Sequence, residues 1–164
     1  MIGDEMVGYK DYEKAVNLIE DNEELKDDIG GCSYKLIEMA EKRLNMKFPK
    51  SYTDFLLKFG ALSFGSEEIY GIVREDFDNS RVPDAIWYTL VERRDAQIPY
   101  WLLSIYDTGS EELICLNFNN INKEGEPTVV SFVPGIDREY QIYEEISKDF
   151  GEFLLSRIKM ELDI

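Results

Sequence analysis

The spacing of apolar residues changes along the chain, and this change constrains the fold more than any other feature of the sequence. Residues 12–19, 36–44 and 52–59 place apolar side chains at helical spacing, which puts them on one face of a helix. These segments are therefore predicted to be amphipathic helices. After Gly65, short runs of β-prone residues replace this pattern, so strands are expected to follow.

Residues at the ends of these segments predict where the second and third helices begin and end. Ser33 is placed to cap the second helix through its hydroxyl, and this helix should end near Asn45. Pro49 suits the start of the third helix, and Ser51 through Asp54 forms a predicted capping box. Gly60 stands where a left-handed carboxyl-terminal cap favours a residue without a Cβ.

Four β-prone segments are expected to form strands, at residues 69–73, 101–106, 113–118 and 128–133. In the first of them, Gly71 indicates a bulge or a close approach of another backbone. The last three are separated only by turn-forming residues, and such short connections favour antiparallel pairing.

Two further helices are predicted after Gly65. The first covers residues 84–94, with Ile86, Trp87 and Leu90 facing inward. The second follows a predicted cap at Ser147 and carries an apolar stripe formed by Phe150, Phe153, Leu154 and Ile158.

This order of elements predicts one α+β domain over residues 1–164. Residues 1–31 should form an N-terminal helix and an acidic connector, and residues 33–161 the core of the domain. The expected architecture has N-terminal helices, a central, mainly antiparallel sheet of about four to six strands, and a C-terminal helix packed on that sheet.

The charge of the chain limits its partners. Its 34 acidic and 18 basic side chains give a formal net charge of -16. This surplus repels phosphate backbones and anionic lipid headgroups, so we expect no direct nucleic-acid or membrane binding. It favours basic proteins instead, although the charge also agrees with a role in solubility alone.

The residue types that most hydrolases need are scarce. Histidine is absent, which removes the usual general base and the usual partner of a Ser or Cys nucleophile. Cys32 and Cys115 are far apart and form neither a CxxC pair nor a zinc-ligand set. The sequence indicates a non-catalytic chain without metal or cofactor, and the lack of a signal peptide or membrane span indicates the cytoplasm.

A carboxylate-based hydrolase is the alternative from a different class. Asp76 and Asp78 do not continue into a calcium-binding loop, because Arg81 occupies the position of the turn glycine and Trp87 that of the bidentate glutamate. The compact acidic cluster at residues 107–112 is the place where catalysis would then be expected.

The order of motifs resembles the SUKH superfamily of bacterial immunity proteins and fungal Smi-type regulators, over residues 37–158. The departure from the family pattern is greatest at residues 81–100. The resemblance rests on Ile37, Ala40, Glu41 and Leu44, then Phe48, Pro49, Ser51, Tyr52, Phe55, Leu56, Phe59 and Gly60, then residues 68–71, Asp107, Gly109 and residues 113–118, and finally Phe150, Phe153 and Leu154.

The resemblance implies a protein that binds and neutralises a cognate toxin, commonly a nuclease domain encoded nearby. A regulatory scaffold for a host protein is the alternative that the resemblance leaves open. The chain is expected to act as a monomer or weak dimer.

The predicted partner-binding face combines loop carboxylates with aromatic anchors. These residues are Glu67, Glu68, Tyr70, Asp76, Asp78, Trp87, Tyr106, Asp107, Glu111 and Glu112. Solvated loop acids and core aromatics are the structural alternative for each of them. A purely structural role is expected for Pro49, Tyr52, Gly60, Gly71 and Gly109.

Overall fold

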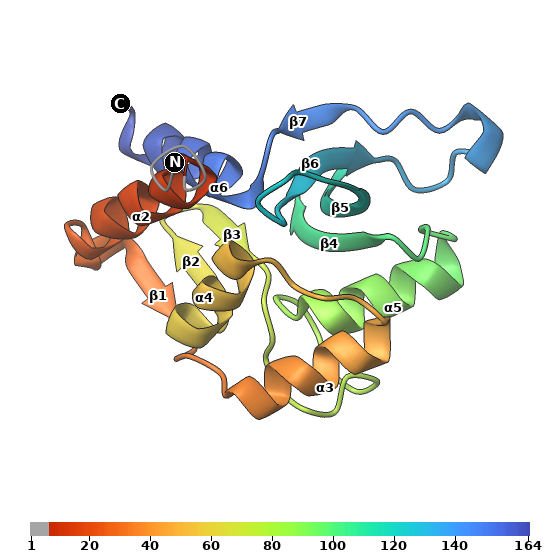
Figure 1. Ribbon diagram of the computed structural model, residues 1–164, viewed down its shortest axis with the longest axis horizontal. Coiled ribbons are helices and arrows are strands. Elements are labelled where there is room, and N and C mark those ends of the chain that lie inside the picture. The colour runs from red at the N-terminus through yellow and green to blue at the C-terminus, as the bar shows by residue number, and fades with distance from the viewer. Residues whose placement is uncertain (1–6) are drawn as a thin grey trace.

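The computed structural model describes the backbone of residues 7–164 and the side chains of residues 9–164, so the first residues of the predicted domain lie outside the described residues. The elements follow the predicted order, with helices first, strands next and a helix at the end (Figure 1). They are α2 (Val7–Glu20), η1 (Glu23–Leu25), β1 (Lys26–Asp28), α3 (Tyr34–Leu44), α4 (Lys50–Phe59), β2 (Leu62–Phe64), β3 (Glu67–Ile69), α5 (Ala85–Asp95), β4 (Leu102–Asp107), β5 (Leu113–Ile121), β6 (Pro127–Phe132), η2 (Arg138–Tyr140), β7 (Glu145–Ser147) and α6 (Phe150–Leu162).

The strands form two antiparallel sheets, ordered β1-β2-β3 and β4-β5-β6-β7. The α+β class and the antiparallel pairing are thus confirmed, while the strands are divided between two sheets where one was expected. The division arises because a loop and α5 separate β3 from β4 along the chain (Figure 1). The amide of Tyr70, just after β3, still donates to the carbonyl of Ile105 in β4 at 2.8 Å, which joins the two sheets.

Part of the predicted acidic connector is a strand. Lys26–Asp28 pairs with Leu62–Phe64 as β1, with Asp27 opposite Ser63. Within this acidic segment, the chain after α2 therefore completes the edge of the smaller sheet.

The main core lies where α2, α4 and α6 meet the strands (Figure 1). Tyr52, Phe55 and Phe150 pack ring against ring, with centroids 5.2 to 5.7 Å apart. A smaller apolar cluster contains Leu102, Cys115 and other strand residues of the four-stranded sheet. This sheet therefore buries side chains on both of its faces, which agrees with the nearly continuous burial along β4 and β6.

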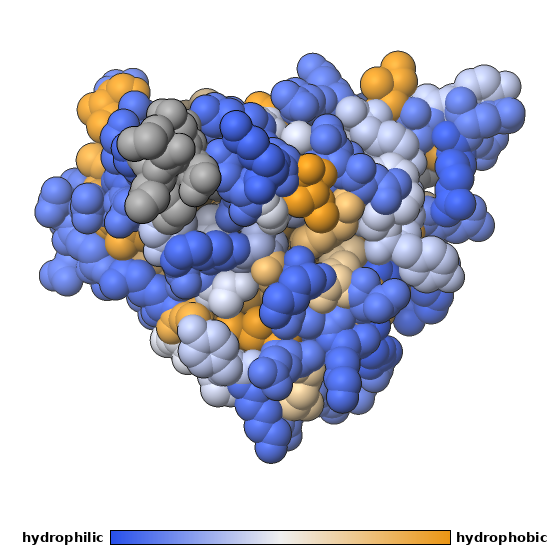
Figure 2. All heavy atoms as spheres, in the orientation of Figure 1, coloured by the Kyte–Doolittle hydropathy of each residue, from blue (hydrophilic) through white to orange (hydrophobic). Residues whose placement is uncertain are grey.

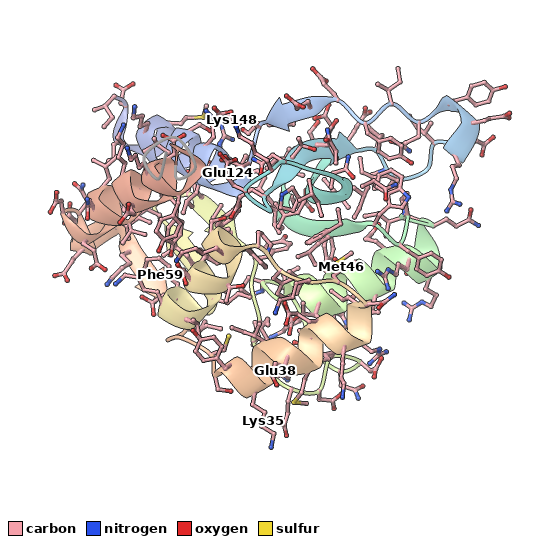
Figure 3. The ribbon with its side chains drawn as sticks, in the orientation of Figure 1. Lys35, Glu38, Met46, Phe59, Glu124 and Lys148 are labelled. Atoms are coloured by element: carbon pink, nitrogen blue, oxygen red, sulfur yellow. The ribbon has the colours of Figure 1, made fainter. Side chains whose placement is uncertain are left out.

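The amphipathic helices follow the apolar spacing of the sequence. In α3, Ile37, Ala40 and Leu44 are buried, while Lys35 and Glu38 point away from the body of the protein (Figure 3). The predicted cap is confirmed, because the Ser33 hydroxyl accepts the amide of Leu36 at 3.1 Å. In α5, Ile86 is buried as predicted, but Trp87 and Leu90 are only half-buried, and Ala85 and Thr89 complete the buried face.

Two predicted caps are wrong. The N-cap position of α4 is held by Pro49 without a side-chain hydrogen bond, and Ser51 instead donates from its amide and hydroxyl to the buried Glu126 carboxylate, at 3.1 and 2.6 Å. Ser147 belongs to β7, and α6 is capped by Asp149, which accepts the amide of Glu152 at 2.9 Å. In both cases tertiary packing determines which side chain reaches the helix terminus.

Gly60 and Gly71 bring two segments of backbone together. Gly60 follows α4 with a φ of +74°, and its carbonyl accepts the amide of Ile72 at 2.9 Å. A Cβ on Gly71 would lie 1.6 Å from that carbonyl oxygen, so the predicted close approach is present. The predicted strand at residues 69–73 stops at Ile69, because the chain turns there toward α4.

Candidate partner-binding surface

Three of the predicted contact residues, Glu67, Tyr70 and Tyr106, are buried inside the protein. Glu67 and Tyr106 are each 9% exposed, and the Tyr106 hydroxyl donates to a Glu67 carboxylate oxygen at 2.9 Å. The guanidinium of Arg157 stands 3.3 Å from the other oxygen of Glu67. Because Glu67 and Tyr106 are buried and contact each other and Arg157, the prediction that they lie on the contact face was wrong. They instead hold β3, β4 and α6 together.

Asp76 and Asp78 lie in an exposed loop whose contacts lead toward α3. Asp78 receives both terminal nitrogens of Arg43, at 2.6 and 3.0 Å, and this pairing lowers the pKa of its carboxyl. Asp76 accepts the side-chain amide of Asn79 at 3.1 Å. These contacts belong to the loop and to α3, so we leave both acids out of the surface defined below.

Glu111 and Glu112 lie in the turn between β4 and β5. Glu111 is exposed and Glu112 half-buried. The Thr108 hydroxyl donates to the Glu112 carbonyl at 2.8 Å, and the Gly109 amide donates to Asp107 at 2.8 Å. Gly109 adopts a φ of +78° here, which its lack of a Cβ permits. The turn therefore presents these acids beside the end of β4.

Of the remaining predicted residues, Glu68, Tyr70 and Asp107 meet at one place, whereas Trp87 does not join them. Tyr70 and Tyr88 form an edge-to-face pair with centroids 5.5 Å apart, and the Tyr88 hydroxyl donates to Asp107 at 3.2 Å. Trp87 is half-buried beside Tyr88 on α5. We define the acid-tyrosine surface as Glu68, Tyr88, Glu92 and Asp107, which come from β3, α5 and the end of β4. These residues lie around the ring of Tyr70, which is only 5% exposed.

The acid-tyrosine surface concentrates negative charge. Burial, together with the charges of Asp107 and Glu68, raises the pKa of Tyr70 to about 12. Burial raises the pKa of Tyr88 as well, and Asp107 and Glu92 add to the effect. The pKa of Glu92 is raised by burial first and then by Asp95 and Asp107.

Within the described side chains, these carboxylates form no ion pair. Within residues 9–164, no Lys or Arg nitrogen lies within 4.0 Å of the carboxylates of Glu68, Glu92 or Asp107. Carboxylates beside tyrosine rings can receive a lysine or arginine side chain from another molecule, through charge-assisted hydrogen bonds and contact with the rings. The geometry thus suits recognition of a cation.

Sequence reasoning missed Tyr88 and Glu92. Both lie on α5, four residues apart, so one face of the predicted helix at residues 84–94 carries both of them. That spacing was a usable signal, but only the packing of α5 against β4 places the face beside Asp107.

The described part of the chain offers neither a metal centre nor a membrane span. Residues 9–164 hold no group of three or more His, Cys, Asp or Glu side chains arranged to bind a metal ion. No helix among the described elements combines the length and apolar character that crossing a membrane requires.

Comparison with known proteins places the fold. The structure is similar to a crystal structure of a protein from Pseudomonas syringae pv. tomato, with a TM-score of 0.51 and 17% identity over 70% of this chain and 80% of that chain. No curated protein matches the sequence. The family model SUKH_5, described as SMI1-KNR4 cell-wall, matches residues 12–159. Because this match runs from within α2 to within α6 and so spans most of the chain, the chain belongs to the SUKH family.

Proposed function

We propose that this chain is a cytoplasmic immunity protein that binds a toxin domain and neutralises it stoichiometrically, without chemistry. The SUKH family includes immunity proteins, and this membership supports the general class. The observation that carries the specific proposal is the acid-tyrosine surface, where three carboxylates lie around the half-buried Tyr88 and the buried Tyr70. Within residues 9–164, these carboxylates form no ion pair.

The proposed partner is a basic nuclease-type domain. Such a domain must present lysine or arginine side chains to hold a phosphate backbone, and the same side chains can enter the acid-tyrosine surface. The net charge of -16 accelerates the encounter with a basic protein and disfavours acidic competitors. Blocking then follows from occupying the place of the nucleic acid.

Co-expression with the toxin domain encoded beside this chain tests the proposal. We expect growth to be restored and a stable complex to form. Glu68→Lys should raise the dissociation constant by about tenfold or more, because it places a cation where the partner's cation binds. Glu24→Lys is the matched control, since Glu24 is also exposed and its replacement changes the net charge equally.

Several outcomes would contradict the proposal. Growth that stays arrested although the protein is abundant would reject neutralisation, and a stable complex with a host protein alone would favour the regulatory scaffold. Substrate turnover that Asp107→Asn abolishes would show a hydrolase instead. Equal weakening by Glu68→Lys and Glu24→Lys would reject the acid-tyrosine surface and leave only the net charge.

A further inference from the structure

The free edge of the four-stranded sheet has features that the acid-tyrosine surface does not explain. β7 is the last strand in the order β4-β5-β6-β7 and pairs only with β6, with Ser147 opposite Val129 and Glu145 opposite Val130. The amide of Ser131 donates to the carbonyl of Glu144 at 2.9 Å, which extends the contact by one residue. Among the described elements, no strand lies on the other side of β7 (Figure 1).

Large hydrophobic side chains are exposed to solvent along this edge and the segment before it. Tyr140 is 70% exposed, Ile142 78% and Ile146 40%. The space-filling view shows a hydrophobic residue protruding from a largely hydrophilic surface along the segment that joins η2 to β7 (Figure 2). Ile146 also lines a hollow of about 330 Å³, with Phe153 and Arg157 among its other walls.

The segment before β7 is held in place, so these exposed side chains are presented on a fixed backbone. The side chain of Gln141 pairs with the backbone of Val133 as a strand would, accepting its amide at 2.8 Å and donating to its carbonyl at 2.9 Å. The ring of Tyr143 packs edge-on against Trp101, with centroids 4.9 Å apart. Half-buried Gln141 and Tyr143 thus alternate with exposed Ile142 and Glu144, which is the period of an extended strand.

The charge of this edge selects one kind of occupant. Glu139, Glu144 and Glu145 are exposed, and within residues 9–164 none of them forms an ion pair. A second copy of this chain would bring the same glutamates against one another, and each copy carries a charge of -16. A strand that alternates basic and apolar side chains avoids this repulsion and covers the exposed isoleucines.

We propose that residues 141–146 dock an extended segment of another protein as an added strand beside β7, with its apolar side chains on the face that carries Ile142 and Ile146 and its basic side chains on the opposite face, beside Glu145. Main-chain hydrogen bonds along the free edge supply affinity, and the alternating side chains supply specificity. This docking site is distinct from the acid-tyrosine surface and does not require the partner to be a toxin.

A labelled peptide of about ten residues that alternates lysine and valine is the probe, and fluorescence anisotropy measures its binding to the full chain. We expect binding that slows amide hydrogen exchange in β7 and that N-methylation of alternate peptide amides removes, because added strands bind through main-chain hydrogen bonds. Ile142→Ser should raise the dissociation constant by about tenfold. Ile164→Ser is the matched control, since Ile164 is 72% exposed at the C-terminus.

A pair of charge reversals separates the β7 edge from the net charge of the chain. Glu144→Lys/Glu145→Lys should raise the dissociation constant of the same peptide by about tenfold or more, whereas Glu23→Lys/Glu24→Lys, two adjacent acids in η1, should change it far less. Equal effects of the two double variants, or undiminished binding of the methylated peptide, would overturn the proposal. A dimer of the chain in sedimentation that Ile142→Ser dissociates would identify a second copy as the occupant instead.

Discussion

Replacing Gly71 with alanine should destabilise the protein through a single steric contact. The added Cβ would lie 1.6 Å from the carbonyl oxygen of Gly60, whereas real Cβ atoms stay at least 3.0 Å from such atoms. The two segments must therefore separate, and that movement stretches the 2.9 Å hydrogen bond from the amide of Ile72 to the same carbonyl. Overpacking and a weakened buried hydrogen bond together lower the free energy of unfolding by about 3 kcal/mol.

For a domain of this size, that loss lowers Tm by about 6–12 °C, measured by differential scanning calorimetry. Gly109→Ala is the control, because Gly109 has a φ of +78° and a Cβ added there would have no atom of the described chain within 4 Å. It should lose about 1 kcal/mol from backbone strain alone. A Gly71→Ala variant no less stable than Gly109→Ala would refute the steric argument.

Three further results are expected. Burial raises the pKa of Glu126 above its ordinary 4.5, so the folded protein disfavours the ionised carboxylate. The free energy of unfolding is therefore highest where Glu126 is protonated, and it falls as pH rises through the raised pKa. Urea unfolding at about pH 4.5 and pH 7 should therefore show Glu126→Gln gaining on the wild type as pH rises, and a constant difference would contradict this linkage. Arg157→Met leaves the buried Glu67 without its cation and should lower the free energy of unfolding by about 3 kcal/mol, partly restored by adding Glu67→Gln; a loss below about 1 kcal/mol would show that the pair is dispensable. Association with a basic toxin domain, followed by stopped flow, should slow by about tenfold between about 0.05 and 0.5 M salt, and an unchanged rate would assign the net charge to solubility alone.

The helices were predictable because their apolar spacing is local information. Residues 12–19 lie inside α2, and most of the buried positions of α3 and α4 are those that the periodicity indicates, although Leu36 of the predicted stripe is only half-buried. The hydroxyl of Ser33 caps α3 as predicted, since that contact spans only three residues. Ser51 differs, because its partner Glu126 lies 75 residues away in the chain.

The candidate site was predictable only in part. Glu68, Tyr70 and Asp107 were identified from residue type and position in turns or strands, and the structure brings them together. Glu67 follows the same pattern as its neighbour Glu68, but the alternation of β3 turns it inward to Tyr106 and Arg157. Successive residues of a strand face opposite sides, so the choice between the two acids depends on which face the rest of the chain covers.

By itself, the sequence determined the α+β class, the positions of the main helices and a surface of strongly negative charge, because these follow from local periodicity and from the count of ionisable groups. Only the tertiary structure decided the division into two sheets, the meeting of Tyr88 and Glu92 with Asp107, and the free edge at β7. These features depend on contacts between residues far apart in the chain, and no local pattern specifies which distant segments will pack together.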